Sequence, residues 1–277
     1  NDYIDQMKVI YKRIQQSLKT RWLVFKDELE VRLGKRHPLL PPKRYDYINI
    51  GANTIINKEF FGYFVEKAGL QADATVLEVG SGFGRMAIPL TEYLSTEGRY
   101  EGLELLKDGV NWCQHHFTPK YPNFKFQRID VYNARYHTTG TQKAETYTFP
   151  FKERTFDFVY LTSVFTHMYP NEIANYLKEV SRVMKPGATC LCTYYLINDI
   201  SKEQIKNRLG TYNFEYSKAD YYIEDLKDPL YQIAFKESTI KTLYEDCKLD
   251  IDAVYYGSWS GRQDFLSFQD IIIAKKI

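Results

Sequence analysis

The apolar positions along the chain follow two patterns, short continuous runs and runs spaced every three or four residues. The continuous runs predict buried strands of a parallel sheet, and the wider spacing predicts helices with one apolar face. The expected strands are 74–79, 99–103, 124–129, 155–161, 188–196, 249–256 and 268–274. The expected helices are 85–94, one beginning at an Asp108 N-cap, 171–184 and 237–247. Strands that alternate with helices predict an α/β fold.

The first expected strand runs directly into a glycine-rich turn, and residues 76–84 spell VLEVGSGFG. A strand, a glycine turn and a helix form the layout that holds a nucleotide-like ligand at the carboxyl end of a parallel sheet. Glycine permits positive φ and lets a ligand approach the backbone closely. The dinucleotide fingerprint requires a glycine at its sixth position, where this chain has Arg85. The spacing therefore disfavours an NAD-dependent oxidoreductase.

Acidic and polar residues follow the next three strands. Glu104 ends the second strand, at the distance from the turn that suits an acceptor of ribose hydroxyl protons. The pair Asp130-Val131 closes the third strand. The fourth strand is followed by the segment 162–168, which contains Ser163 and His167. These positions predict a ligand site at the carboxyl ends of the strands.

The motif Glu-x-Gly-x-Gly-x-Gly at 78–84 resembles the first motif of class I S-adenosylmethionine-dependent methyltransferases. With Glu104, the pair at 130–131 and the Met-Lys-Pro-Gly-Ala turn at 184–188, four motifs occur in the family's order between 74 and 197. The family's usual form of the last motif is Leu-Lys-Pro-Gly-Gly. The resemblance implies a Rossmann-like, seven-stranded mixed sheet that ends in an antiparallel hairpin. The alternative is a doubly wound domain that binds another ligand.

The resemblance also implies S-adenosylmethionine as cofactor, S-adenosylhomocysteine as product and a set of binding residues. The glycines would approach the methionine portion, and Glu78 would orient the turn or bind the amino group. Glu104 would bind the ribose, and Asp130 the adenine amino group. The implied cofactor-binding residues are Glu78, Gly80, Ser81, Gly82, Gly84, Glu104, Leu105, Asp130, Val131 and Ser163.

His167 is the expected catalytic base, because a hydroxyl acceptor must lose a proton and the pKa of histidine lies near neutral pH. Alternatively, His167 orients its loop or contacts the cofactor. Asp264 and Asp270 are weaker candidates for the base. Enzymes that methylate amino groups of nucleic-acid bases commonly carry Asn/Asp-Pro-Pro-aromatic after the fourth strand, where residues 162–165 spell TSVF. A nucleic-acid substrate is therefore not expected.

The expected reaction is O-methylation of a small-molecule or sugar (glycan) acceptor. Within the family, the segments SVFTHM at 163–168 and SFQDII at 267–272 resemble those of bacterial enzymes of sugar or secondary-metabolite pathways. The alternatives are N-methylation, carboxyl methylation and a non-catalytic protein that binds S-adenosylmethionine on the same fold. The acceptor is expected to contact a tyrosine-rich cap insertion at about 199–232, because such insertions near the ligand end of a sheet often set specificity.

Residues 1–44 form an expected helical arm and linker ahead of a methyltransferase domain at 45–277. The arm holds eleven Lys/Arg and five Asp/Glu, a net charge of +6. Its apolar residues recur at helical spacing. They are Ile4, Met7, Tyr11, Ile14, Leu18, Trp22, Phe25, Leu29 and Leu33. This face predicts packing on the core, a homodimer contact or a contact with an anionic surface. Gly34 ends the pattern, and the proline-rich segment 37–42 is an expected rigid linker.

Length and composition narrow the remaining possibilities. The 277 residues, 44% of them hydrophobic, suit one large domain with additions. The four cysteines form no Cys-x-x-Cys pair, which predicts reduced thiols and a cytoplasmic protein. No metal site is expected, since His115 and His116 are adjacent on a predicted helix and point apart. No apolar run approaches about 20 residues and no signal-peptide pattern is apparent, so no membrane span is expected.

Overall fold

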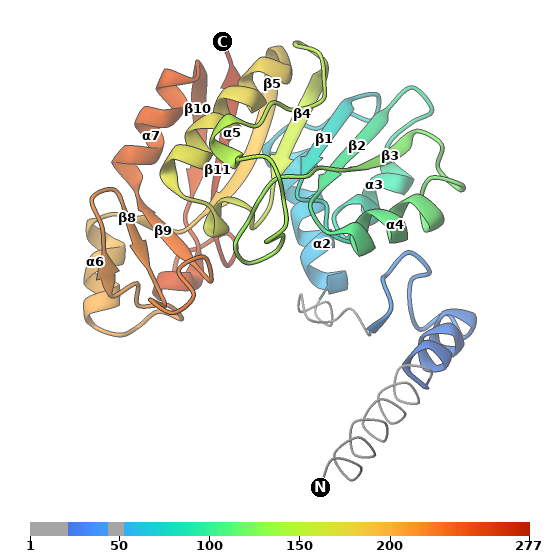
Figure 1. Cartoon of the computed structure of the whole chain (residues 1–277), viewed down its shortest axis with the longest axis horizontal. Helices are drawn as coiled ribbons and strands as arrows, with labels where there is room; N and C mark the ends of the chain where they lie inside the picture. Colours follow the sequence, from blue (N-terminus) through green and yellow to red (C-terminus); the bar gives the residue numbers. More distant parts are fainter. Residues whose placement is uncertain (1–21, 44–52) are drawn as a thin grey trace, which may run out of the picture.

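A seven-stranded sheet forms the centre of the molecule in the computed structural model, which describes residues 22–43 and 53–277 (Figure 1). Its strand order is β10-β11-β5-β4-β1-β2-β3. The strands are β1 (Thr75–Val79), β2 (Arg99–Glu104), β3 (Phe124–Arg128), β4 (Phe156–Leu161), β5 (Met184–Tyr194), β10 (Leu249–Tyr255) and β11 (Asp270–Lys276). Strand β11 pairs antiparallel with β5 and β10, whereas β1 to β5 pair parallel. The predicted mixed sheet and its final hairpin are confirmed.

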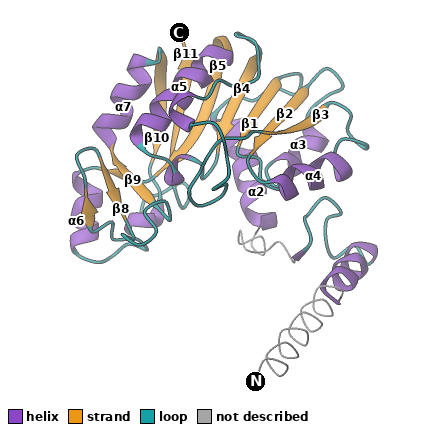
Figure 2. Ribbon diagram, in the orientation of Figure 1, coloured by secondary structure: helices purple, strands orange, loops and turns teal. Residues whose placement is uncertain are grey.

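Helices cover both faces of the sheet (Figure 2). On one side lie α2 (Asn53–Gly62) with η3 (Tyr63–Lys67), α3 (Ala87–Tyr93) and α4 (Lys107–His116), and on the other lie α5 (Pro170–Val183) and α7 (Glu237–Asp246). Each side has its own hydrophobic core. Val76 packs into the first core and its neighbour Leu77 into the second, because successive side chains of a strand point to opposite faces.

Most expected boundaries differ from the structure by two residues or fewer, and two of the differences change the local geometry. Helix α4 begins one residue before Asp108, and its N-cap is Leu106, without a side-chain hydrogen bond. Strand β5 begins at Met184 rather than at 188, directly after α5. Met184 pairs with Phe156 and Thr189 with Phe158, so the intervening Lys-Pro-Gly residues bulge out of the ladder. The bulge tolerates the proline, which cannot donate a ladder hydrogen bond.

The cap is a second, four-stranded sheet with the order β6-β9-β8-β7 and a helix, α6 (Asp199–Lys206). Its strands are β6 (Leu196–Ile197), β7 (Tyr216–Ser217), β8 (Tyr221–Ile223) and β9 (Ile233–Lys236). Strand β6 precedes the expected insertion 199–232 and β9 follows it, so the cap extends a few residues beyond the insertion at each end. Its aromatic residues pack on the short helix η6 (Ser258–Ser260), where Trp259 is buried against Tyr195 and Phe214. Many of the tyrosines and phenylalanines are thus packing residues.

Asp270 joins the cap to the central sheet. Its buried carboxylate accepts hydrogen bonds from the Leu196 backbone N–H at 2.6 Å, the Gly257 backbone N–H at 2.7 Å and the Trp259 indole N–H at 2.8 Å. Burial raises the pKa of this carboxyl to about 7, although the three N–H donors act in the opposite direction. Asp270 is committed to these contacts, and Asp264 is exposed. Neither aspartate lines the cavity described below, so neither is placed to serve as the base.

Replacing Asp270 by alanine is expected to lower the free energy of unfolding by about 2–4 kcal/mol, because three buried N–H donors lose their acceptor. Urea unfolding followed by circular dichroism measures this change. Asp264→Ala removes an exposed carboxylate and serves as the control, with an expected change within about 0.5 kcal/mol. Equal stability of the two variants would contradict the anchoring role of Asp270.

The described part of the N-terminal arm comprises a helix over 22–32 and the linker that follows it. The linker packs on the domain, since Leu39 and Leu40 are buried and the Trp112 indole N–H donates to the Leu39 carbonyl at 3.3 Å. Along the helix, Trp22 is 63% exposed and Phe25 is 56% exposed. Their apolar face therefore does not pack on the domain in this part of the arm. The apolar positions up to Leu18 lie outside the described residues.

The described residues offer no candidate for a membrane span or for a metal site. No helix among them is long and apolar enough to cross a bilayer. No group of three or more histidine, cysteine or acidic side chains in the same ranges is arranged to hold a metal ion.

Candidate active site

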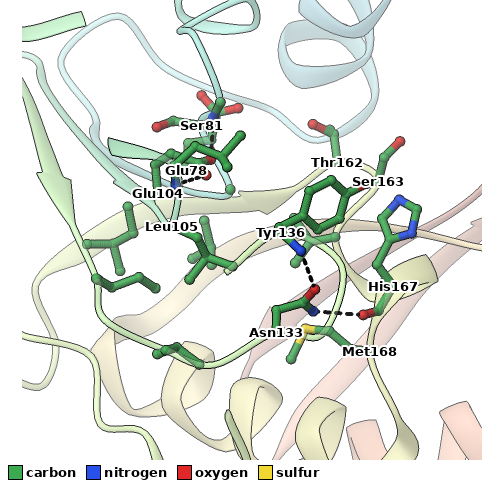
Figure 3. Close-up of a pocket in the computed structure, with 18 of the residues that line it drawn as sticks. Glu78, Ser81, Glu104, Leu105, Asn133, Tyr136, Thr162, Ser163, His167 and Met168 are labelled. Carbon is green, nitrogen blue, oxygen red and sulfur yellow. Dashed lines mark hydrogen bonds between the residues drawn. The ribbon is translucent and has the colours of Figure 1, made fainter. Parts of the chain in front are cut away.

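A cavity of about 220 Å³ opens at the carboxyl ends of β1, β2 and β4. The chain passes from β1 to β2 and β3 on one side and returns to β4 and β5 on the other, so the cavity lies at the switch point of the sheet, where such folds bind ligands. Predicted site residues line it from several elements (Figure 3). They are Glu78, Gly80, Ser81, Gly82, Glu104, Leu105, Val131, Ser163 and His167. Gly84 and Asp130 do not line it.

The three glycines of the turn all have positive φ, but their surroundings differ. A Cβ atom added to Gly82 would meet no atom within 4 Å, whereas one added to Gly80 would lie 2.5 Å from Val164. At Gly84 an added Cβ would lie 2.8 Å from the Phe117 ring. Gly82 therefore leaves open space at the cavity wall, while Gly80 and Gly84 allow close packing inside the protein.

Glu104 holds the glycine turn from the end of β2. Its carboxylate accepts hydrogen bonds from the Gly82 N–H at 2.6 Å and the Leu106 N–H at 2.7 Å. Burial raises the pKa of Glu104 above its ordinary value, although these N–H donors act in the opposite direction. Each oxygen of a carboxylate has a further lone pair, so Glu104 can also accept the protons of two ligand hydroxyls.

Glu78 is buried beneath the turn between two tyrosines of neighbouring strands. It accepts a hydrogen bond from the Tyr160 hydroxyl at 2.8 Å and another from the Tyr100 hydroxyl. Burial raises the pKa of Glu78 to about 7, and the tyrosine donors and nearby Arg85 lower it. Of the two roles expected for Glu78, its contacts with protein groups favour support of the turn.

Ser81 lines the cavity, but its hydroxyl oxygen lies against β2, where a Cβ added to Gly102 would be 3.0 Å from it. This oxygen is buried and has no hydrogen-bond partner among the described residues, and such groups normally have one. The open space at Gly82 and the carboxylate of Glu104 adjoin Ser81 in the cavity lining. A ligand with a polar amino-acid portion and a ribose fits this combination.

Asp130 points away from the cavity. Ile129 and Val131 line the cavity, and the side chain between them faces the opposite way, as alternation along an extended segment requires. The Asp130 carboxylate accepts hydrogen bonds from the Thr141 hydroxyl at 2.6 Å and the His137 ring at 2.8 Å. These contacts lower the pKa of Asp130. The structure thus gives no support to its expected contact with the adenine amino group.

His167 lies in a short helix after β4, η5 (Phe165–His167), and faces the cavity. Its Nδ1 atom is 2.8 Å from the backbone carbonyl oxygen of Leu230 in the cap. A carbonyl only accepts, so Nδ1 carries the proton and Nε2 carries a lone pair. Burial lowers the pKa of His167, and this favours the neutral form. The ring is thus held as a neutral base.

The loop after β3 contributes lining residues that the sequence motifs did not indicate. Asn133 accepts hydrogen bonds from the backbone N–H groups of Arg135 and Tyr136, both at 3.0 Å. Its amide donates to the His167 carbonyl at 3.2 Å, and the rings of Tyr136 and His167 lie 5.3 Å apart. A polar and aromatic segment directly after a strand was the available signal. Pro41, Glu172 and Tyr176 also line the cavity, from the linker and α5.

Comparison with known proteins agrees with this geometry. Residues 77–192 match a family model described as a methyltransferase domain. The structure is similar to an S-adenosylmethionine-dependent methyltransferase from Methanosarcina mazei, with 19% identity, 77% of this chain and 97% of the other covered, and a TM-score of 0.52. It is also similar to an S-adenosylmethionine-dependent methyltransferase from Clostridium acetobutylicum, with 15% identity, 83% of this chain and 97% of the other covered, and a TM-score of 0.54. A third similar structure is a protein from Pyrococcus horikoshii, with 16% identity, 85% of this chain and 96% of the other covered, and a TM-score of 0.56.

At these identities the solved structures establish the fold, and the match to the family model adds the activity. The matched segment runs from β1 into β5 and includes the glycine turn, Glu104, Ser163 and His167. The chain therefore has the fold of class I methyltransferases and is an S-adenosylmethionine-dependent methyltransferase.

Proposed function

We propose that this protein methylates a hydroxyl oxygen of a small molecule or a glycan, with His167 as the base. The observation that carries the proposal is the bond from His167 to the Leu230 carbonyl, at 2.8 Å. It places the proton of the neutral ring on Nδ1 and leaves Nε2 unprotonated, on a side chain that lines the cavity. A hydroxyl acceptor requires such a base, because its proton must leave as the oxygen attacks.

The other lining residues have binding roles in this proposal. Glu104 accepts the ribose hydroxyl protons, and the methionine portion lies against the open face at Gly82, next to Ser81. Glu78 keeps the turn in place through its two tyrosine partners. S-adenosylmethionine supplies a methyl group that is already activated by a sulfonium leaving group. The remaining task of the protein is to align the acceptor oxygen with that methyl group, exclude water and accept one proton.

His167 also distinguishes between kinds of acceptor. A carboxylate carries no proton for Nε2 to accept, and its negative oxygens would face the lone pair of a neutral ring. A hydroxyl donates to that lone pair before it loses its proton. The lone pair on Nε2 therefore favours a hydroxyl over a carboxylate acceptor.

Replacing Glu104 by alanine should weaken S-adenosylhomocysteine binding by about 1–3 kcal/mol, because the variant loses a charge-assisted acceptor for the ribose hydroxyls. Isothermal titration calorimetry measures the change. Glu101→Ala is the matched control, since Glu101 lies on the same strand but not in the cavity lining. Unchanged affinity in Glu104→Ala would refute the ribose assignment.

The proposed reaction can be tested before the acceptor is identified. A metabolite extract is incubated with the protein and S-adenosylmethionine labelled in its methyl group, and labelled products are separated and treated with mild alkali. Methyl ethers survive this treatment, whereas methyl esters are hydrolysed. Label in alkali-stable, oxygen-linked methyl groups is the expected result. Label only in alkali-labile or nitrogen-linked groups would exclude O-methylation.

A further inference from the structure

A single hydrogen bond determines where His167 carries its proton, and the two partners of that bond belong to different sheets. His167 follows β4 of the central sheet, and Leu230 precedes β9 of the cap sheet. The distance from His167 Nδ1 to the Leu230 carbonyl oxygen is 2.8 Å. Strand pairing within either sheet does not fix this distance, so contacts between the connecting segments hold it.

Residues 133–137, in the loop after β3, form a closed turn with hydrogen bonds of its own. Backbone bonds join Asn133 and His137 in both directions, at 3.1 and 2.9 Å. Inside the turn, Asn133 Oδ1 accepts from the backbone N–H groups of Arg135 and Tyr136, both at 3.0 Å. A backbone N–H only donates, so the carbonyl end of the Asn133 amide faces the turn. The amide nitrogen can therefore donate to a group outside the turn.

This turn holds His167 on one side. The Asn133 amide nitrogen donates to the His167 backbone carbonyl at 3.2 Å (Figure 3). The Tyr136 ring packs edge-on against the His167 imidazole, with 5.3 Å between the ring centres. The backbone and the ring of His167 are thus both in contact with the turn.

The same turn holds the Leu230 carbonyl on the cap side, through Arg135. The Arg135 guanidinium forms an ion pair with Asp228 and lies 5.2 Å from the centre of the Tyr231 ring. The Tyr231 N–H donates to the Asp228 carbonyl at 2.8 Å, and this bond closes a tight turn of the cap with Leu230 inside it. Arg135 therefore contacts the first and the last residue of that turn, and the Leu230 carbonyl between them is oriented.

The contacts of Arg135 act together. An ion pair at the protein surface contributes little alone, and Arg135 and Asp228 are both partly exposed. The Arg135 guanidinium also lies over the Tyr136 ring, 5.7 Å from its centre. Cation–π attraction to a ring of its own turn and to a ring of the cap adds to the ion pair. Loss of the guanidinium removes all of these contacts at once.

We propose that Asn133 and Arg135 are positioning residues, which hold His167 and Leu230 against each other and so keep the imidazole proton on Nδ1. This inference rests on the proposed role of His167 as the base. Asn133 acts on the backbone of His167, and Arg135 acts on the turn that carries Leu230. When either contact is lost, Nδ1 loses its acceptor and the proton moves to Nε2 in a larger share of the molecules. An Nε2 atom that carries the proton has no lone pair for the proton of a hydroxyl acceptor.

Nitrogen NMR of the full chain measures the tautomer without an acceptor and without turnover. The protein is labelled with ¹⁵N in its histidines, and the His167 signals are identified by their absence from His167→Ala. At about pH 8 the ring is neutral, and its two nitrogens give distinct signals with and without a proton. The wild type is expected to carry the proton on Nδ1.

Two substitutions test the two contacts separately. Asn133→Asp retains an acceptor for the N–H groups of its turn but replaces the amide donor by a carboxylate oxygen. Arg135→Met keeps a long side chain and removes the guanidinium. In each variant the ratio of the Nε2–H to the Nδ1–H tautomer of His167 is expected to rise about fivefold or more, the equivalent of one hydrogen bond. A role in stability alone would leave this ratio unchanged in the folded protein.

A third substitution separates position from charge. Burial is the main cause of the lowered pKa of His167, and in addition the charge of Arg135 lowers this pKa while that of Asp228 raises it. Arg135→Met and Asp228→Asn therefore have opposite electrostatic effects on the ring but break the same ion pair. A rise of the tautomer ratio in both variants is expected, and it reports the position of the ring rather than its surrounding charge.

Arg208→Met is the control, because it removes an exposed arginine of the cap, and it should keep the wild-type ratio. The affinity for S-adenosylhomocysteine, measured by calorimetry, is expected to stay within about twofold of wild type in all these variants, because Glu104 and the glycine turn are intact. Normal affinity shows that a variant is folded around its cavity. If one variant fails this check, the others decide, because Asn133 and Arg135 hold different partners of the bond.

Each result supports or overturns the inference. A wild-type ring with its proton on Nε2 would overturn both the inference and the assignment of His167 as the base. An unchanged ratio in Asn133→Asp and Arg135→Met would overturn the inference and leave the proposed base intact, as would shifts of opposite sign in Arg135→Met and Asp228→Asn. Label only in nitrogen-linked or alkali-labile methyl groups, in the extract experiment, would exclude O-methylation without altering the tautomer, so the two failures are distinguishable.

Discussion

Turnover of an acceptor hydroxyl is expected to fall about 10²–10⁴-fold when His167 is replaced by alanine, while cofactor affinity changes little. The variant loses the Nε2 lone pair that accepts the proton, but it retains Glu104 and the glycine turn. The measurement is a comparison of kcat with the S-adenosylhomocysteine affinity of the same protein. His115→Ala is the matched control, because His115 is exposed on α4 and bonded only within its own helix.

The pH dependence provides a second test of His167. Burial lowers its pKa below the ordinary value of 6.5, so the neutral base is already present at pH 7. Wild-type turnover should therefore be level above neutral pH and should fall as the ring is protonated in acid. The His167→Ala variant should instead gain rate as pH rises, because the acceptor begins to ionise without help. Similar turnover of the variant and the wild type at neutral pH would remove His167 from the mechanism.

Replacing Gly82 by valine is expected to weaken S-adenosylhomocysteine binding about 10³-fold or more and to leave a folded protein. An added Cβ meets no protein atom within 4 Å, so the side chain fits the cavity wall but occupies space that the ligand requires. The effect is measured by calorimetry, and folding by circular dichroism.

A second glycine separates the two effects of this substitution. Gly187 also has positive φ, and a Cβ added to it likewise meets nothing within 4 Å, but Gly187 does not line the cavity. Gly187→Val should therefore carry the same backbone strain, about 1–2 kcal/mol, and bind the cofactor normally. Wild-type affinity in Gly82→Val would show that the turn does not contact the ligand.

The sequence predicted the fold because the signals for strands and helices are local. Apolar runs such as 74–79 and the spacing along 171–184 report which face of an element is buried, and the structure has β1 and α5 at these positions. The same local order indicated where the ligand site lies. Glu104, Ser163 and His167 each follow a parallel strand, and parallel strands bring their carboxyl ends to one edge.

The direction of a side chain was harder to predict from the sequence where the residue lies in an irregular segment and not in a helix or strand. Asp130 lies just beyond β3, and its carboxylate turns to Thr141 in the loop that follows. The motif order gave its position but not its partner. Likewise, the Lys-Pro-Gly turn correctly marked the end of α5, but it did not indicate that β5 begins at Met184 and bulges before Thr189.

The sequence by itself determined the sheet, its covering helices and the set of residues at the ligand edge. The tertiary structure alone decided what those residues can do chemically. The tautomer of His167 depends on Leu230, 63 positions away, and Glu78 is held by Tyr160, 82 positions away. The sequence made Asp270 a candidate base, but three N–H donors from other segments hold its carboxylate in a structural role. Hydrogen-bond direction and pKa arise from contacts between distant segments, and no local periodicity encodes them.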